Sequence, residues 1–214
     1  MIRIAQDGGI WTLTLDRPDK ANALNAGMLE ALIDGVGAAH AADACVLILT
    51  GTGRVFSAGA DLDAARAGLA TSPLWEALSG QIAGFPGLSI AALNGTLAGG
   101  ACGMALACDL RLAVPGAKVF YPVMRLGFLP QPSDPARLVA LVGPARAKMV
   151  LMAGAKVTAE EARDWGLVDR ICDAEALMDT ALALAADAAQ AQPDHVAAIK
   201  RLIPAQQAMR PAGN

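Results

Sequence analysis

Two stretches of the chain repeat the same order of residue types, and each could present bare backbone amides to a ligand. The first runs from Val46 to Asp61 and the second from Ser89 to Cys102. Each begins with an apolar run, continues through a Gly-Thr pair, and reaches small residues that open a helix. The first amides of a helix have no partner within it and carry the positive end of the helix dipole. Small residues there let a ligand approach the backbone closely.

These two helix openings suggest an oxyanion hole, which is the central hypothesis drawn from the sequence. The inward donors would be the N–H groups of Ala60 in the first loop and Gly100 in the second. Backbone donors that converge on one oxygen stabilise the negative charge of acyl-transfer and enolate chemistry. The alternative interpretation is that both loops are only tight turns with close helix–strand packing. The repetition of strand, Gly-Thr and Ala-Gly in both stretches favours the functional interpretation.

The elements that must position the two loops are strands alternating with helices. Apolar and polar residues alternate from Met1 to Leu15 around Gly8, which predicts a hairpin. Asn25 is a preferred N-cap residue and predicts a helix that runs toward His40. The patterns further predict strands over 46–50, 89–93, 110–114 and 119–121, a helix over 99–107, and helical, solvent-facing material between 61 and 84.

The last third of the chain has a helical pattern. The predicted helices cover residues 135–142, 145–152, 159–165, 174–191 and 195–207. Strands alternating with helices before this point predict an α/β fold. We therefore expect a core over residues 1–134 that holds the site, and a helical region over 135–214 that serves as a cap or in oligomerisation.

Composition excludes several classes of partner. The 214 residues are 55% hydrophobic and 17% charged with a net charge of −3, which predicts a compact globular protein and argues against nucleic acid or an anionic membrane as the partner. The uncharged stretch 88–108 is long enough to span a membrane, but its Ala and Gly content and the Asn94-Gly95 break favour a buried strand followed by a buried helix.

Histidines and cysteines indicate neither a metal site nor an exported protein. The two histidines, His40 and His195, are far apart in the sequence with no carboxylate cluster between them, so we expect no metal. The four cysteines show no C-x-x-C spacing, which favours reduced, buried thiols in a cytoplasmic protein. The N-terminal residues do not resemble a signal peptide, which agrees with a cytoplasmic location.

Four segments, in order along the chain, carry a resemblance to one family. They are LDRPDKANALN at 15–25, GTGRVFSAGADL at 51–62, NGTLAGGACGMALACD at 94–109 and TAEEARDWGLVD at 158–169. These segments resemble the motifs of the enoyl-CoA hydratase/isomerase family, the crotonase superfamily. The resemblance implies a crotonase-like spiral of ββα units that binds acyl-CoA thioesters and needs no cofactor, because coenzyme A is part of the substrate. It also implies a homo-oligomer, either a trimer or a hexamer.

The resemblance assigns roles position by position. Ala60 and Gly100 match the two residues whose N–H groups polarise the thioester carbonyl. The positions that match contacts to coenzyme A are Lys20, Ala21, Ala23, Ala58, Asp61 and Leu62. Asp61 and Asp109 fall on the family's usual aspartate positions, and we interpret both as structural partners at a helix end or a turn rather than as catalytic residues.

The chain also departs from the family's pattern. Family hydratases hold a water molecule between two glutamates, and the matching positions are Gly103 and Val123. Neither residue can transfer a proton, so ordinary hydration is not supported and an isomerase-like or decarboxylase-like reaction is favoured. The chain ends at Asn214, where family members continue into further helices, so we expect a more open site or a different assembly.

Four other residues near the motifs are weaker candidates for proton transfer or substrate contact. Asp134 precedes a proline, which is more typical of a helix cap than of an acid or base. Arg125 could hold a substrate carboxylate, although a surface salt bridge would also explain it. Tyr121 is expected in a strand that packs on the core, where its hydroxyl could reach the acyl group. Cys102 lies at a helix start, which can lower the pKa of a thiol, but it also suits a buried filler.

Three rival functions compete with this interpretation. Val55–Gly59 is close to the nucleophile elbow of serine hydrolases, with Ser57 as nucleophile, but the first glycine of that motif is missing. A dinucleotide site is weaker, because neither glycine-rich stretch has the required spacing. A non-catalytic acyl-CoA-binding protein is the third possibility, favoured by the missing glutamates. Such a protein would bind acyl-CoA without turnover.

Overall fold

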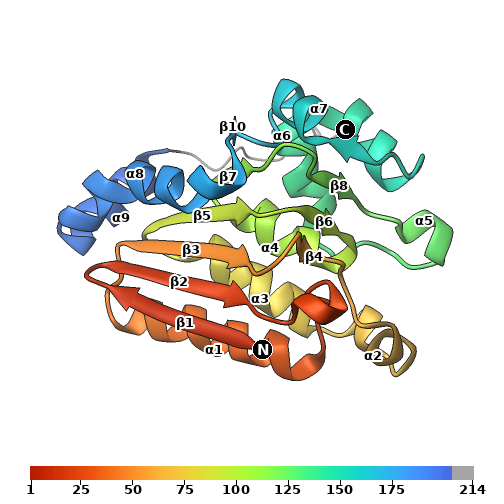
Figure 1. The fold of residues 1–214 in the computed structure, drawn as a ribbon, viewed down its shortest axis with the longest axis horizontal. Coiled ribbons are helices and arrows are strands. Elements are labelled where there is room, and N and C mark those ends of the chain that lie inside the picture. The colour runs from red at the N-terminus through yellow and green to blue at the C-terminus, as the bar shows by residue number, and fades with distance from the viewer. Residues whose placement is uncertain (204–214) are drawn as a thin grey trace, which may run out of the picture.

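The structure is a computed structural model that describes residues 1–203, and its centre is a six-stranded sheet. The strand order is β1-β2-β3-β5-β7-β10. The bounds are Ile2–Asp7 (β1), Ile10–Leu15 (β2), Val46–Gly51 (β3), Leu88–Leu93 (β5), Leu110–Ala113 (β7) and Arg170–Ile171 (β10). The hairpin β1–β2 is antiparallel, and every other pair in this sheet is parallel. Figure 1 shows these strands stacked in that order from β1 upward.

A second, smaller sheet has four short strands. Its order is β4-β6-β8-β9, with bounds Val55–Ser57 (β4), Thr96–Ala98 (β6), Lys118–Phe120 (β8) and Val157–Thr158 (β9). The strands β3, β5 and β7 are neighbours in the large sheet, and β4, β6 and β8 are neighbours in the small one. Each turn of the chain thus adds one strand to each sheet and then a helix. This is the predicted spiral of ββα units.

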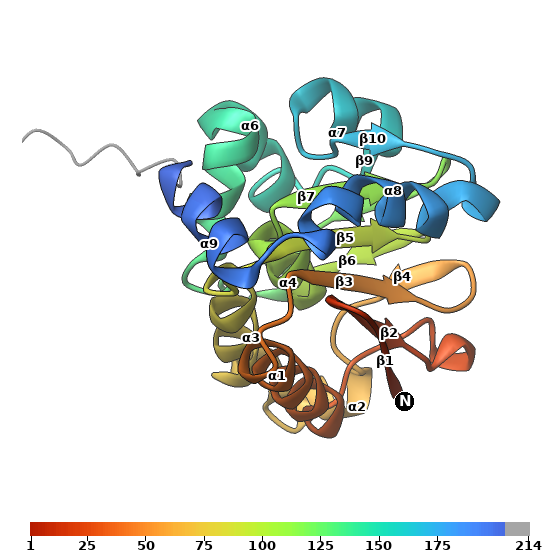
Figure 2. The same ribbon diagram turned by 90° about the vertical axis from the view of Figure 1, so that its left-hand side faces the viewer.

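Nine α-helices cover the sheets within residues 1–203. Their bounds are Ala26–Ala41 (α1), Leu62–Arg66 (α2), Leu74–Ala83 (α3), Cys102–Ala107 (α4), Val123–Leu126 (α5), Asp134–Leu151 (α6), Ala159–Trp165 (α7), Leu177–Gln190 (α8) and Pro193–Leu202 (α9). Figure 2 shows α1, α3 and α4 following one another alongside the strands. On the large sheet, α1 packs against β1 and β2, while α8 packs against β3, β5 and β7.

Several local predictions are confirmed for clear physical reasons. The strand β3 consists of uncharged residues, and five of its six residues are buried, as expected for a parallel strand covered on both faces. Asn25 caps α1 by accepting a hydrogen bond from the Met28 amide. The two helices predicted on either side of Gly143 run together as α6, but Gly143 has φ of 78° and breaks the helix before Pro144.

Other predictions need correction. The segment between 61 and 84 is not simply solvent-facing, because α3 buries Trp75, Leu78, Ser79 and Ile82. The strands β4, β6, β9 and β10 were not predicted, since two or three residues show no periodicity. The segment 134–203 is mostly helical and also adds β9 to the small sheet and β10 to the large one. The predicted helix over 195–207 corresponds to α9 up to Leu202, and its last residues lie outside the described part.

The uncharged stretch 88–108 folds as β5, β6 and α4, so the membrane-span alternative is not needed. Within residues 1–203, none of the helices combines the length and apolar character that crossing a bilayer requires. The same residues contain no group of three or more His, Cys, Asp or Glu side chains placed to hold a metal ion. All four cysteines are free thiols; Cys45, Cys102 and Cys108 are buried as predicted, whereas Cys172 is only partly buried.

Candidate functional site

The two small-residue loops meet at a pair of glycines. Gly59 has φ of +92° and Gly99 has φ of +59°, values that glycine adopts without strain. A β-carbon added to Gly59 would lie 2.9 Å from the Ala98 carbonyl oxygen and 3.4 Å from the α-carbon of Gly99. A side chain at Gly59 would push the loops apart, whereas a β-carbon at Gly99 would lie 3.6 Å from the Gly59 α-carbon, in ordinary contact. The loops after β4 and β6 therefore touch through backbone alone, which the sequence repetition suggested but could not establish.

The amides that follow these glycines are oriented by their neighbours. Ala60 and Leu24 form an isolated parallel β-bridge. The Leu24 amide donates to the Gly59 carbonyl, and the Asp61 amide donates to the Leu24 carbonyl, both at 2.8 Å. In such a bridge the N–H of Ala60 itself points away from Leu24. Gly100 lies in the 3-10 turn Gly99–Ala101 that leads into α4, where backbone amides lack helical partners. Both residues are half-buried.

Asn22 joins the first motif to the first loop, and it is not among the residues singled out from the sequence. It is fully buried with φ of +52°. Its side-chain amide donates to the carbonyls of Thr52 and Val55 at 2.9 and 2.7 Å, and its Oδ1 accepts from the Arg17 amide. Buried asparagine in the left-handed region is a recognisable turn signal. Its position between two expected contacts to coenzyme A could have drawn attention to it.

The hydroxyl of Ser57 is buried between backbone groups. Its hydroxyl donates to the Asn22 carbonyl at 2.8 Å and accepts from the Gly59 amide at 3.1 Å, and the residue is fully buried. A nucleophilic serine needs an exposed hydroxyl beside a base. His195, the partner considered for it, lies exposed on α9. The geometry of Ser57 fits a role in shaping the loop.

The two aspartates interpreted as structural partners each hold neighbouring segments of the chain together. Asp61 caps α2 by accepting from the Asp63 and Ala64 amides, and it also pairs with Arg17 at 2.9 Å. The hydrogen bond from the Ala64 amide is the largest cause that holds the pKa of the Asp61 carboxyl below its usual value, and the hydrogen bond from Arg17 is the second. Asp109 accepts from the amide and hydroxyl of Ser89 and pairs with Lys200 at 2.7 Å.

The expected contacts to coenzyme A form one edge of the site. Lys20, Ala58 and Leu62 are exposed, and Leu62 is 74% exposed despite its apolar side chain. Ala21 accepts a hydrogen bond from the Ala58 amide at 3.0 Å, so these two positions are adjacent in space. Ala23 is buried behind them. The structure thus brings Ala21 and Ala58 together, and Asp61 and Leu62 follow at the start of α2.

Trp75 covers the other side of the second loop. A β-carbon at Gly100 would lie 3.2 Å from three atoms of the Trp75 ring, so the indole rests on the Gly100 α-carbon. The indole N–H donates to the Leu69 carbonyl at 2.7 Å, which fixes the ring. No sequence pattern singles out Trp75, because nothing near it repeats. It provides an apolar wall beside the Gly100 amide.

A carboxylate lies one helical turn further along the same face. Gly103 is three residues after Gly100, and a β-carbon there would lie 2.9 Å from Oδ1 and 3.2 Å from Oδ2 of Asp134. Asp134 is the first residue of α6, and Ser133 occupies the N-cap position without a capping hydrogen bond. The interpretation of Asp134 as a helix cap is therefore wrong. Its side chain points into the protein and is only 1% exposed.

Asp134 belongs to a polar cluster at the start of α6. The Tyr121 hydroxyl donates to Oδ2 of Asp134 at 2.9 Å, and Arg137 lies 3.8 Å from Oδ1. Glu76, next to Trp75 on α3, accepts hydrogen bonds from the amide and hydroxyl of Ser133. Tyr121 follows β8 and is buried, as predicted. The cluster joins α3, α6 and the end of β8 around Gly103.

Burial changes the acidity of this cluster. It raises the pKa of Asp134 to about 6, against the opposing effects of the Tyr121 hydrogen bond and Arg137. Burial, together with Asp134, also raises the pKa of Tyr121 above its ordinary value. The pKa of Cys102 is raised as well, first by burial and then by Asp134. The suggestion that the helix start lowers the pKa of Cys102 is therefore wrong, because desolvation dominates.

Arg125 lies apart from the two loops. It is exposed on α5, and no ion pair within residues 1–203 involves it. It borders a surface groove shared with Lys156, whose ammonium lies 5.2 Å from the centre of the Phe120 ring. Val123, at the second glutamate position, is buried and apolar.

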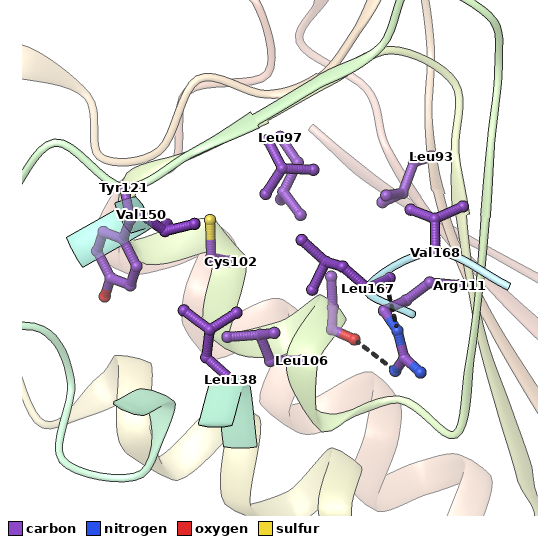
Figure 3. Close-up of a pocket in the computed structure, with 12 residues that line it drawn as sticks. Leu93, Leu97, Cys102, Leu106, Arg111, Tyr121, Leu138, Val150, Leu167 and Val168 are labelled. Carbon is purple, nitrogen blue, oxygen red and sulfur yellow. Dashed lines mark hydrogen bonds between the residues drawn. The ribbon is translucent and has the colours of Figure 1, made fainter. Parts of the chain in front are cut away.

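A small cavity lies beside α4. Its volume is about 20 Å³, the space of a single water molecule, and its lining is apolar. Figure 3 shows Cys102 and Leu106 of α4 together with Leu138 and Val150 among the residues that line it, with Arg111 at one end. Tyr121, whose hydroxyl donates to Asp134, also lines this cavity. The cavity is a packing defect rather than a substrate site.

Comparisons with known proteins agree on one family. A family model described as enoyl-CoA hydratase/isomerase matches residues 5–212. A carnitinyl-CoA dehydratase of Salmonella arizonae is 37% identical, over 94% of this chain and 79% of the relative. A 1,2-epoxyphenylacetyl-CoA isomerase of Escherichia coli is 33% identical, over 83% of this chain and 71% of the relative. A crystal structure of an enoyl-CoA hydratase from Bacillus anthracis superposes with a TM-score of 0.87 at 30% identity, covering 94% of this chain and 81% of that one.

Proposed function

Because the chain belongs to the enoyl-CoA hydratase/isomerase family, we propose that it acts on an acyl-CoA thioester through an enolate-like intermediate. The oxygen of that intermediate is held by the N–H groups of Ala60 and Gly100. The observation that carries this proposal is the backbone contact between Gly59 and Gly99, which brings the two loops to one junction. Since the donors are fixed before the substrate arrives, they stabilise the developing charge without reorganisation.

The substrate's nucleotide would lie along the edge made by Lys20, Ala21 and Ala58. The exposure of Lys20 leaves its ammonium free to pair with phosphate, and the exposed Leu62 side chain offers an apolar surface beside it. The acyl group would then extend past Gly100 along the indole of Trp75. No cofactor is required, because coenzyme A activates the acyl group as a thioester.

The reaction is isomerase-like or decarboxylase-like rather than hydration. Gly103 and Val123 supply no acid or base at the two glutamate positions, so a water molecule has no paired carboxylates to activate it. Double-bond migration and loss of CO2 from a malonyl-type ester both pass through an enolate and need only an oxyanion hole and a proton carrier.

A turnover screen with a backbone variant tests this proposal. Wild-type protein and the variants Ala60→Gly and Gly100→Pro are assayed with enoyl-, dienoyl- and malonyl-type CoA esters. Ala60→Gly should keep its activity because it keeps the amide, whereas Gly100→Pro deletes a donor and should lose about 3–4 kcal/mol of transition-state stabilisation. Wild-type turnover in Gly100→Pro would refute the assignment. Binding without turnover of any ester would instead indicate a non-catalytic acyl-CoA-binding protein.

We also propose that the protein is a homo-oligomer, a trimer or a hexamer. Four large apolar side chains on and after α5 are exposed, namely Met124, Leu126, Phe128 and Leu129. An apolar surface of this kind is typical of a protein–protein interface. Light scattering coupled to gel filtration measures the mass directly, and a monomer at micromolar concentration would refute this proposal.

A further inference from the structure

A carboxyl group occupies the space into which a side chain at position 103 would project. Gly103 and Gly100 are three residues apart on one helical face, a spacing of about 5–6 Å. Because the Asp134 carboxylate covers the α-carbon of Gly103, it lies about one helical turn from Gly100. A larger residue at 103 would exclude Asp134 from this place, so the glycine and the aspartate fit each other.

The hydrogen bonding of Asp134 is incomplete on one side. Oδ2 accepts from Tyr121, but Oδ1 is buried without a hydrogen-bond partner among residues 1–203. The nearest cation, Nη1 of Arg137, is 3.8 Å away, too far for a hydrogen bond, and is itself unpartnered. A carboxylate with a purely structural role is normally paired at both oxygens, since an unsatisfied buried acceptor lowers stability. Oδ1 therefore retains an unused capacity to accept a hydrogen bond or a proton.

Tyr121 fixes the direction of this carboxylate. Its hydroxyl donates to Oδ2 of Asp134 and accepts from the Gln131 amide at 3.3 Å, so the proton of the hydroxyl is directed toward Asp134. The Gln131 side chain in turn donates to the Ala70 carbonyl, which ties this loop to the segment before α3. Oδ1 is left as the reactive oxygen because Oδ2 is already engaged.

Charged and titratable groups from four elements face Asp134. Arg137 is on α6, Glu76 on α3, Cys102 on α4 and Tyr121 follows β8. Arg137 favours the carboxylate form, Glu76 disfavours it, and burial disfavours it most, which brings the pKa of Asp134 to about 6. A group with this pKa is mostly ionised at neutral pH and can also carry a proton, which suits a base that must later act as an acid.

We propose that Asp134 is the catalytic residue that carries the proton between two carbons of the bound acyl group, and that Tyr121 is its positioning residue. This inference rests on the proposed function, since it requires an acyl thioester held at Ala60 and Gly100. Of the reactions proposed above, the one it assigns to Asp134 is the migration of a double bond between the β,γ and α,β positions of an enoyl thioester.

The proposed step is balanced within the site. Oδ1 of Asp134 removes a proton from the α-carbon of a β,γ-unsaturated thioester, and the electron pair of the C–H bond moves into a dienolate whose oxygen the two amides hold. The carboxyl proton exchanges with solvent, and the protonated carboxyl then delivers a proton to the γ-carbon, so that in D2O this carbon receives deuterium. The double bond ends between the α- and β-carbons, and neither water nor an oxidant is consumed.

Deuterium exchange into a probe ester tests this assignment, whatever acyl group the natural substrate carries. The probe is 3-hexenoyl-CoA in D2O, with deuterium in the recovered ester counted by mass spectrometry and binding measured by calorimetry. The variants are Asp134→Asn, Tyr121→Phe and Gly100→Pro. The matched control is Asp194→Asn, an exposed aspartate in the first turn of α9. Thermal unfolding checks that each variant folds.

Wild type and Asp194→Asn should exchange at the same rate, and Asp134→Asn should exchange at least about 100-fold more slowly while binding the ester. In Tyr121→Phe the inflection of the exchange rate against pH should move upward, because the hydrogen bond that favours the carboxylate is lost. Near-wild-type exchange in folded Asp134→Asn, or an unchanged inflection in Tyr121→Phe, would overturn the inference.

Failure of the proposed function has a different signature. In that case the wild type does not bind 3-hexenoyl-CoA, or Gly100→Pro exchanges at the wild-type rate. If wild type binds the ester and Gly100→Pro impairs exchange while Asp134→Asn does not, the oxyanion hole stands and only the role of Asp134 is wrong. If Asp134→Asn fails to fold, the pH profile of Tyr121→Phe decides.

Discussion

Asp134 lies against Gly103 so closely that a β-carbon at position 103 would be 2.9 Å from Oδ1 of the carboxylate. The two residues are 31 positions apart, 134 minus 103, and come from different helices. The absence of a side chain at position 103 is thus linked to the presence of a buried carboxyl group beside it.

This fit predicts an energetic coupling between the two residues. Gly103→Ala places a β-carbon in the space of the carboxylate and should cost about 1–3 kcal/mol of unfolding free energy, partly offset by the higher helix propensity of alanine. In the double variant with Asp134→Ala the clash is absent. Urea denaturation of the four proteins should give a coupling energy of at least about 1 kcal/mol. Additive effects would mean that the contact is loose.

Asp134 should also make stability depend on pH. Its pKa in the folded protein, about 6, is above the value of about 3.9 expected in the unfolded chain, so the folded state binds the extra proton between these values. The free energy of unfolding should therefore fall as pH rises from 4 to 7, by up to about 3 kcal/mol. Asp134→Asn carries no titrating group there and should lose this component. Denaturation at several pH values from 4 to 7 gives the unfolding free energy of wild type and of Asp134→Asn. The difference between these two free energies should change by up to about 3 kcal/mol over this range. A difference that stays constant would contradict the expected proton uptake.

Asn22 should matter more than another asparagine nearby. Asn22→Ala removes hydrogen bonds to three segments of backbone and places alanine at φ of +52°, so we expect a loss of about 2–4 kcal/mol. Asn25→Ala removes only the cap of α1 and should cost about 1 kcal/mol. Denaturant titrations compare the two directly. Equal losses would show that Asn22 does not support the loop.

Ser57 should not react as a nucleophile. Its hydroxyl is buried between the Asn22 carbonyl and the Gly59 amide, so a fluorophosphonate probe should leave wild type and Ser57→Ala equally unlabelled. Ser57→Ala should instead lower stability by about 1–3 kcal/mol, because it leaves those partners without their hydrogen bonds. Mass spectrometry of the intact protein detects labelling. Labelling that disappears in Ser57→Ala would restore the serine-hydrolase alternative.

Many of the strands and helix ends can be predicted from the sequence, because strong local signals specify them. The uncharged runs at β3 and β5, the Asn25 cap and the Gly143-Pro144 break each depend on neighbouring residues only. The three-residue strands β4 and β6 escape detection, since their partners are set by the spiral and not by their own pattern.

The site is less predictable because its contacts join distant segments. The positions of Ala60 and Gly100 follow from repetition and resemblance, but the contact of Gly59 with Gly99 does not. Asp134 looks like a cap when only its neighbour Pro135 is considered. Its inward direction depends on Tyr121 and on the absence of a side chain at Gly103, and neither effect is local.

The central claim is that the amides of Ala60 and Gly100 converge on the carbonyl oxygen of a bound thioester. The most direct measurement is the infrared difference spectrum of an acyl-CoA labelled with 13C at the thioester carbonyl, free and bound to the wild-type protein. Two hydrogen bonds to the oxygen weaken the C=O bond, so the labelled band should move to lower frequency on binding. A bound ester whose band stays at the frequency of the free ester in water, or moves higher, would contradict this claim.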